Sequence, residues 1–184
     1  MKVNNNIFVR GMSGKVGDQF VVRQGKGGQT IIANKPTFPT NREFQPSQLA
    51  HQDAFREAIA YAKSAKDEPI YIAKAEGTTM SPFNVAVADW FKKPVVHEID
   101  ANGWTGEIGQ TIRVKAQDEI HVAKVRVAIC DENGILEQGD AVQAEGLWWT
   151  YTTTTAITIQ PQTSIVATAQ DLALNTAELV WQNS

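Results

Sequence analysis

From Val95 onward, apolar and polar side chains alternate with a period of two, as they do in half-buried β-strands. Five segments carry this pattern: 108–116, 120–129, 147–159, 164–169 and 177–181. Turn residues separate them about every 8–12 positions, the clearest being Asp131-Glu132-Asn133-Gly134. The pattern predicts about six or seven strands that form an antiparallel β-sandwich over residues 95–184.

The first 36 residues carry shorter apolar runs that glycines interrupt. Gln19–Arg23 and Gln29–Ala33 are both rich in β-branched residues, and they flank Gly25-Lys26-Gly27-Gly28. Two such runs around a glycine-rich turn predict a β-hairpin. Residues 35–46 contain three prolines, and we expect them to form an extended connector.

A helical period appears after this connector. Apolar side chains recur every three or four positions from Leu49 to Ala62, which predicts a helix over residues 47–66. The sequence Asp67-Glu68-Pro69 is a stop signal for that helix. The next apolar run, Ile70–Ala73, is short and predicts a strand.

A second helix is predicted to begin at Ser81-Pro82, because serine caps helices and proline suits a first helical turn. Its apolar face would carry Phe83, Val87 and Trp90, and Lys92-Lys93-Pro94 would end it. The period changes to two directly afterwards. We therefore predict two domains, a basic α+β module over residues 1–94 with a β-hairpin plus two helices, and an all-β sandwich over residues 95–184.

The two halves of the chain carry opposite charge. Residues 1–96 hold 13 Lys and Arg against 8 Asp and Glu, whereas residues 97–184 hold 4 against 12. This asymmetry indicates an anionic partner for one half, a head-to-tail attraction between copies, or simply two different solvated surfaces. The one cysteine, Cys130, excludes an internal disulfide framework.

Sequence motifs in the C-terminal half resemble bacterial immunoglobulin-like domains. In that family a strand ends in an A-x-D turn, a V-x-V-x-V strand runs into a D-x-NG turn, and W-x-Y and A-x-D…N-T segments complete the sandwich. The matching segments here are Ala116 to Asp118, Val125 to Ile129, Asp131 to Gly134, Trp149 to Tyr151, and Ala169 to Thr176. The resemblance implies an immunoglobulin-like sandwich and carries no information about a ligand.

The N-terminal half resembles a bacterial and phage-associated family of unknown function. Its pattern comprises a G-x-SGK-x-G start, an A-x-KP exit from a hairpin, a PS-x-x-Q helix entry and an FN-x-A-x-x-D helix. The matching segments are Gly11 to Gly17, Ala33 to Pro36, Pro46 to Gln48, and Phe83 to Asp89. This resemblance implies a domain organisation only.

No constellation of catalytic side chains emerges from the sequence. Cys130 ends an apolar strand and is interpreted as a structural thiol without a base. The three histidines lack the spacing of a zinc site, so we predict no metal and no cofactor. One alternative stays open, because Asp118, Asp131 and Asp171 all lie in predicted turns and would hold calcium if they met at one end of the sandwich. We do not expect an enzyme.

Two groups of side chains are candidates for binding. In a strand, Trp149 and Tyr151 share one face and Trp148 takes the other, so the three residues form either core or a contact surface. The glycine-rich hairpin faintly resembles the DNA-grasping arm of bacterial histone-like proteins, although the helices that precede that arm are missing. Candidate contacts to a polyanion or partner are Lys15, Arg23, Lys26 and Lys35.

Three functions follow from these patterns. The first is a non-catalytic structural or assembly protein, phage-derived or part of a particle, whose partner is a protein. The second is recognition of a glycan or protein by the sandwich, and the third is polyanion binding by residues 1–45. The segment MKVNNNIFVRG has no signal-peptide pattern and no apolar run spans a membrane, so we expect a cytoplasmic or particle-associated protein, with another export route left open.

Overall fold

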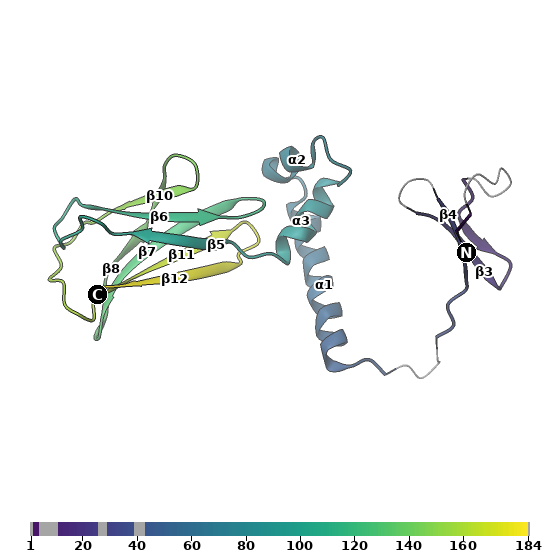
Figure 1. Cartoon of the computed structure of the whole chain (residues 1–184), viewed down its shortest axis with the longest axis horizontal. Coiled ribbons are helices and arrows are strands. Elements are labelled where there is room, and N and C mark those ends of the chain that lie inside the picture. Colours follow the sequence, from purple (N-terminus) through teal and green to yellow (C-terminus); the bar gives the residue numbers. More distant parts are fainter. Residues whose placement is uncertain (1, 4–10, 26–28, 39–42, 184) are drawn as a thin grey trace. The chain divides into compact units, whose positions relative to one another are not determined.

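A computed structural model of the chain describes residues 2–3, 11–25, 29–38 and 43–183 (Figure 1). The chain divides into two compact units, Met1–Gln48 and Leu49–Ser184. The described residues form antiparallel sheets and helices, which agrees with the predicted mixture of an α+β part and an all-β part at this coarse level. The predicted domain boundary at residue 94 lies inside the second unit, which holds most of the helical residues as well as the C-terminal strands.

The first unit is a small antiparallel sheet with the strand order β1-β4-β3-β2. Its strands are β1 (Lys2–Val3), β2 (Gly14–Val16), β3 (Phe20–Gln24) and β4 (Thr30–Asn34). Strands β3 and β4 pair from Phe20 opposite Asn34 to Gln24 opposite Thr30, which confirms the predicted hairpin. Its tip, residues 26–28, lies outside the described residues.

In the described stretch 43–183, three helices follow instead of the two that the sequence predicts: α1 (Pro46–Ala65), α2 (Pro69–Ala75) and α3 (Pro82–Trp90). The predicted strand at Ile70–Ala73 was wrong, because this segment lies in α2. Pro69 starts the helix, and Tyr71 and Ala75, four residues apart, are both buried on one side of it. Burial of that side outweighs the β-propensity of Ile70, Tyr71 and Ile72.

Two four-stranded antiparallel sheets form the rest of the second unit. One sheet has the order β5-β6-β10-β9, with β5 (Val95–Asp100), β6 (Thr111–Gln117), β9 (Val142–Gln143) and β10 (Trp148–Thr152). The other has the order β12-β11-β7-β8, with β7 (Val122–Asp131), β8 (Gly134–Asp140), β11 (Ser164–Asp171) and β12 (Thr176–Gln182).

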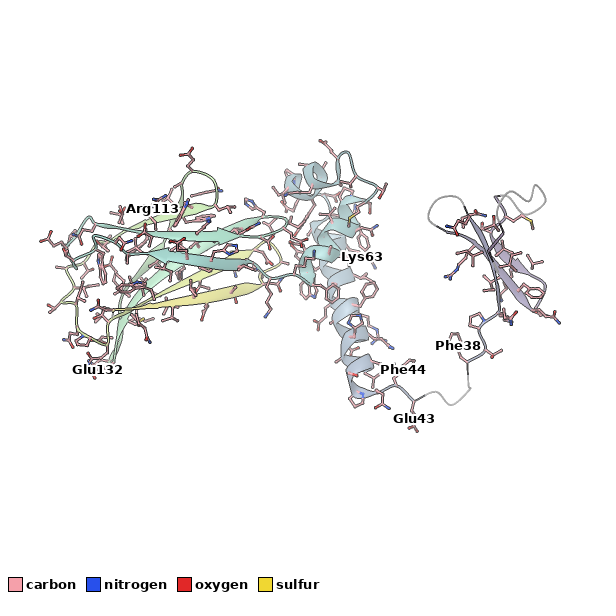
Figure 2. The ribbon with its side chains drawn as sticks, viewed as in Figure 1. Phe38, Glu43, Phe44, Lys63, Arg113 and Glu132 are labelled. Carbon is pink, nitrogen blue, oxygen red and sulfur yellow. The ribbon has the colours of Figure 1, made fainter. Side chains whose placement is uncertain are left out.

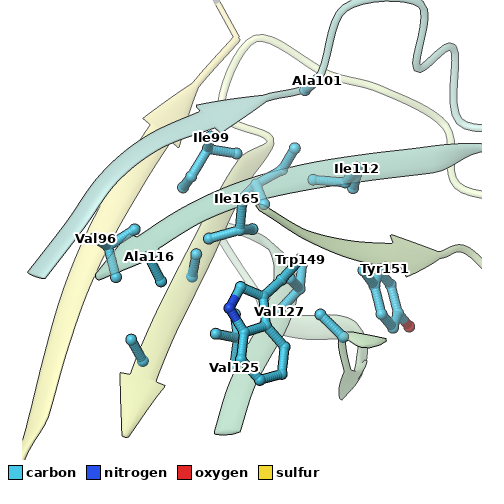
Figure 3. Packing of buried hydrophobic residues seen from close by; sticks show 14 of the residues in the cluster. Val96, Ile99, Ala101, Ile112, Ala116, Val125, Val127, Trp149, Tyr151 and Ile165 are labelled. Atoms are coloured by element: carbon cyan, nitrogen blue, oxygen red, sulfur yellow. The ribbon is translucent and has the colours of Figure 1, made fainter. Parts of the chain in front are cut away.

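Both sheets bury their inward side chains in one shared core (Figure 3). Ile112 and Val114 come from β6, whereas Val125 and Val127 come from β7 and Ile165 comes from β11, and all five are fully buried. The alternation in β11 is complete, with every second residue buried from Ile165 to Asp171. The predicted β-sandwich is therefore present, and its core depends on the period-two pattern of the sequence.

Candidate functional site

The aromatic candidates on β10 separate by face. Trp149 and Tyr151 are 7% and 5% exposed and belong to the core of the sandwich (Figure 3). Trp148 is half-buried on the other face, where the guanidinium carbon of Arg113 lies 4.4 Å from the centre of its ring. A sugar that stacked on this side of the ring would have to displace the Arg113 guanidinium. Arg113 is labelled in Figure 2.

Tyr151 belongs to a buried polar network that joins the two sheets. Its hydroxyl donates a 2.7 Å hydrogen bond to Glu137 Oε1, and Glu137 lies in β8 of the opposite sheet. The backbone N–H and the hydroxyl of Thr154 donate to the same oxygen, and the N–H of Thr155 donates to Oε2. Gly139 makes room for this contact, because a Cβ there would lie 2.6 Å from a ring carbon of Tyr151.

The pKa of Glu137 falls below its ordinary value. Burial alone would raise the pKa of this carboxyl, but the hydrogen bonds from Thr154, Tyr151 and Thr155 outweigh it because they stabilise the ionised form. The pKa of Tyr151 is raised to about 12, chiefly because the hydroxyl is buried and secondly because it donates to Glu137. The network is a structural link between the two sheets.

The basic candidates lie in the first unit. Lys15 stands opposite Val21, and Arg23 is two residues beyond Val21, so Lys15 and Arg23 share one face of the sheet. The Lys35 ammonium lies 3.9 Å from an oxygen of Asp18. Lys26 is outside the described residues.

The opposite face of this sheet is apolar. Val16 stands opposite Phe20, and Val22 stands opposite Ile32, which places these four side chains on one side. Val16 and Phe20 remain 44% and 42% exposed. Of the described residues in this unit, only Val22 and Thr30 are buried. We refer to Val16, Phe20, Val22 and Ile32 as the apolar face.

A cluster of three carboxylates lies between the helices and one end of the sandwich, within the second unit. Asp89 comes from α3, Asp118 follows β6, and Asp171 ends β11. One oxygen of each carboxylate lies within 4.8 Å of the others. Asp89 and Asp171 are each 1% exposed, and Asp118 is partly buried.

Two of these carboxylates each have one oxygen that is buried without a hydrogen bond. Asp89 accepts a 2.6 Å bond from the Tyr71 hydroxyl at Oδ2, but its Oδ1 has no partner. Asp118 accepts from the N–H groups of Ile120 and His121 at Oδ2, and its Oδ1 also has no partner. Buried polar atoms normally have a hydrogen-bond partner, so we expect each of these two oxygens to bind a ligand or to carry a proton.

Asn175 connects the third carboxylate to the helices. Its backbone and side-chain N–H groups both donate to Asp171, at 2.7 Å each. The same side-chain nitrogen approaches the carbonyl oxygens of Asp89, Trp90 and Lys92, the last at 2.9 Å. The end of α3 and the β11–β12 turn are therefore held together at the cluster.

No lysine or arginine in the described part of the chain forms an ion pair with this cluster. Burial raises the pKa of Asp89 to about 6, against the hydrogen bond from Tyr71, and the negative charges of Asp171 and Asp118 raise it further. Burial also raises the pKa of Asp171, and the Asp118 carboxylate adds to that shift. The cluster thus brings three carboxyl groups together without an ion pair to a described lysine or arginine.

A surface groove of about 460 Å³ leads to this position. Lys92, Lys93, Val95, His97, Gln117, Asp118 and Glu119 line it. The Lys92 ammonium contacts the carboxylate of Glu119 at the rim. Asp118 belongs both to the groove and to the cluster, whereas Asp89 and Asp171 are buried behind it.

Sequence reasoning found two of the three cluster residues and missed the third. Asp131 was expected beside Asp118 and Asp171, but it lies at the other end of β7, where it accepts bonds from the N–H groups of Asn133 and Gly134. Asp118 and Asp171 each end an Ala-Gln-Asp triplet that closes a strand, and this repeat was the available signal. The sequence did not connect Asp89 with the other two carboxylates, because Asp89 lies in a predicted helix, as the last residue of the FN-x-A-x-x-D motif.

Comparisons with known proteins yield little. No family model matches the sequence, and no curated protein matches it. Among solved structures, the chain is similar to the crystal structure of an engineered protein, with 21% identity and a TM-score of 0.37 over 58% of this chain and 27% of that one. It is also similar to a double mutant of an endo-β-1,4-mannanase from Cellulomonas fimi, with 24% identity and a TM-score of 0.33 over 58% of this chain and 23% of that one.

The chain thus spans about a quarter of the length of these two structures, and at such TM-scores neither likeness bears on its function. Within the described residues, no helix is both long enough and apolar enough to cross a membrane.

Proposed function

We propose that the C-terminal sandwich is immunoglobulin-like. Named in chain order, its eight strands would be A, B, C, C′, D, E, F and G, and the two sheets then read A-B-E-D and G-F-C-C′. These are the strand orders of immunoglobulin domains with one added C′ strand. The chain departs from that class because its single cysteine, Cys130, lies in β7 and no inter-sheet disulfide is available.

The function that we propose is non-catalytic self-assembly through the first unit. The observation that carries it is the scarcity of buried side chains there, with Val22 and Thr30 alone buried among the described residues of Met1–Gln48. A chain segment of this length seldom folds stably without disulfides, metals or a partner, and this one contains no cysteine. The apolar face would complete its core against a second copy of the chain.

Charge supports a copy of the same chain as the partner. Residues 1–45 carry 7 basic and 2 acidic side chains, whereas residues 97–184 carry 4 and 12. The first unit of one copy is therefore attracted to the sandwich of the next, because opposite potentials steer association. Lys15 and Arg23 lie on the face opposite the apolar one, so they would steer the approach of the two copies without lying in the contact that the apolar face makes.

Replacing Phe20 with lysine is expected to weaken self-association by at least about tenfold, because buried aromatic anchors supply much of the energy of an interface. Light scattering coupled to size-exclusion chromatography of the full chain, over a range of concentrations and salt, measures this. The wild type is expected to form oligomers that shrink as salt rises, since screening weakens the attraction between opposite charges.

Ala33→Lys is the matched control. Ala33 is exposed on β4 and pairs with Val21, so its side chain lies on the face opposite to the apolar one. This variant adds the same charge and should assemble as the wild type does. A wild-type chain that stays monomeric at every concentration and salt, or an Ala33→Lys variant as impaired as Phe20→Lys, would contradict the proposal.

A second candidate function is polyanion binding, favoured by the shared face of Lys15 and Arg23. If these side chains neutralise phosphates, a Lys15→Ala, Arg23→Ala double variant should lower the slope of log affinity against log salt by about two. A gel-shift titration of duplex DNA over several salt concentrations measures the slope. Lys63→Ala, an exposed lysine of α1, serves as the control. Absence of any shift at low salt would remove this candidate.

A further inference from the structure

We propose that Asp89, Asp118 and Asp171 bind a calcium ion at the junction between the helices and the sandwich. The three carboxylates converge from α3, from the loop after β6 and from the end of β11. Two independent observations meet at this point. The first is the convergence itself, and the second is the pair of buried, unpartnered oxygens, Asp89 Oδ1 and Asp118 Oδ1.

The unpartnered oxygen of Asp89 is decisive because that side chain is 1% exposed and solvent cannot satisfy it. A buried ionised carboxylate is costly unless a cation or several donors compensate it. Asp171 obtains its donors from Asn175, but Asp89 has only the Tyr71 hydroxyl. A cation at the cluster would compensate all three charges at once.

The spacing and the ligand type favour calcium. Calcium binds oxygen atoms at about 2.3–2.6 Å, so ligands on opposite sides of it stand up to about 5 Å apart. The oxygens here lie within 4.8 Å of one another. Magnesium demands shorter bonds in strict octahedral geometry, and zinc prefers nitrogen and sulfur ligands, of which the cluster offers none.

The bound ion would tie together elements that are distant in sequence. Asn175 already joins the end of α3 to the β11–β12 turn, and Asp118 belongs to a third segment. Lys74 donates to the carbonyl of Glu119, one residue beyond Asp118, so α2 also contacts this loop. Calcium would therefore stabilise the junction between the helices and the sandwich. Of the three ligands, Asp118 is the one that also lines the surface groove.

Terbium provides a direct probe, because it takes the same oxygen ligands as calcium and luminesces when a nearby tyrosine is excited. Tyr71 donates to Asp89 at 2.6 Å and lies close enough to sensitise it. Full-length protein stripped with a chelator should bind terbium, and calcium should displace it with a dissociation constant of about 0.1–1 mM. Saturating calcium should raise the Tm by about 3 °C over potassium chloride of equal ionic strength, and magnesium should not.

Asp118→Asn and Asp89→Asn should each weaken calcium binding by about tenfold or more, because affinity depends on the number of charged ligands. The amide keeps the shape of the side chain and can still accept the existing hydrogen bonds, and circular dichroism checks that each variant folds. Asp131→Asn, at the other end of β7, is the matched control and should bind as the wild type does.

Three results would overturn the proposal. The first is a wild-type protein with no terbium luminescence and no calcium-dependent rise in Tm, which would mean that protons neutralise the cluster. The second is an equal response to magnesium. The third is a loss of binding in Asp131→Asn as large as in Asp118→Asn. None of these outcomes bears on self-assembly, which is measured separately by oligomer size.

Discussion

Gly106→Ala is expected to lower the free energy of unfolding of the second unit by about 3–5 kcal/mol, through backbone strain and steric overlap together. Gly106 lies between β5 and β6 with a φ of +87°. A Cβ at this position would stand 2.0 Å from the carbonyl oxygen of Ile157, which cannot move aside because it is backbone. The Gly106 carbonyl also accepts a 2.8 Å bond from the Ile157 N–H.

Gly109→Ala separates the two causes. Gly109 lies in the same loop with a φ of +84°, but no atom stands within 4 Å of the Cβ that alanine would add. Its cost should be limited to the left-handed backbone, about 1 kcal/mol. Urea unfolding followed by tryptophan fluorescence measures both variants. Equal losses in the two variants would show that the contact with Ile157 contributes nothing.

The period-two pattern made the sandwich predictable because alternate residues of its inner strands, such as β6 and β11, are buried in the core. Strand β11 illustrates this, since alternate residues from Ile165 to Asp171 are buried. The same rule predicts Trp149 and Tyr151 on one face and Trp148 on the other, and burial follows that division. Local spacing is sufficient where burial repeats along a single element.

The same reasoning failed where contacts between distant elements decide the outcome. The segment around Tyr71 has the β-propensity of a strand. The Tyr71 hydroxyl, however, forms hydrogen bonds with Asp89 in α3 and with the Tyr61 hydroxyl in α1, so both of its partners lie on other helices. Spacing within the chain does not encode those contacts. The helix α2 was missed for this reason.

Only part of the carboxylate cluster could be predicted, because one of its members depends on a contact between distant elements. The two Ala-Gln-Asp triplets end strands at the same end of the sandwich, so Asp118 and Asp171 could be expected to meet. Asp131 was grouped with them on turn chemistry alone, although it ends the strand that begins beside Asp118 and so lies a full strand length away. Asp89 required knowledge of how α3 packs.

Glu137→Gln is expected to destabilise the sandwich by about 1–3 kcal/mol at neutral pH. Three donors converge on Oε1 of Glu137, from the Tyr151 hydroxyl and from two groups of Thr154, and the Thr155 N–H approaches Oε2. An amide nitrogen at either position would face a donor instead of accepting from it. The substitution therefore removes a charge-assisted acceptor and leaves a buried donor unpaired.

The loss of unfolding free energy caused by Glu137→Gln should become smaller as the pH falls. Because the pKa of Glu137 is lower in the folded chain than in the unfolded chain, its stabilising contribution is fully present above the unfolded value. That contribution disappears as the pH falls below about 4 and through the folded pKa. The difference in unfolding free energy between the wild type and Glu137→Gln should therefore be largest near neutral pH and shrink in acid.

Glu132→Gln is the matched control for this measurement. Glu132 is exposed in the turn between β7 and β8, where its carboxylate accepts only a 3.4 Å bond from Gln162 (Figure 2). Its removal should change the unfolding free energy by less than about 0.5 kcal/mol at any pH. Urea unfolding at several pH values distinguishes the two variants. If the Glu137→Gln difference stayed constant or grew in acid, the ionised carboxylate would not be the acceptor that joins β8 to β10, and the link between the sheets would depend on packing around Tyr151 alone.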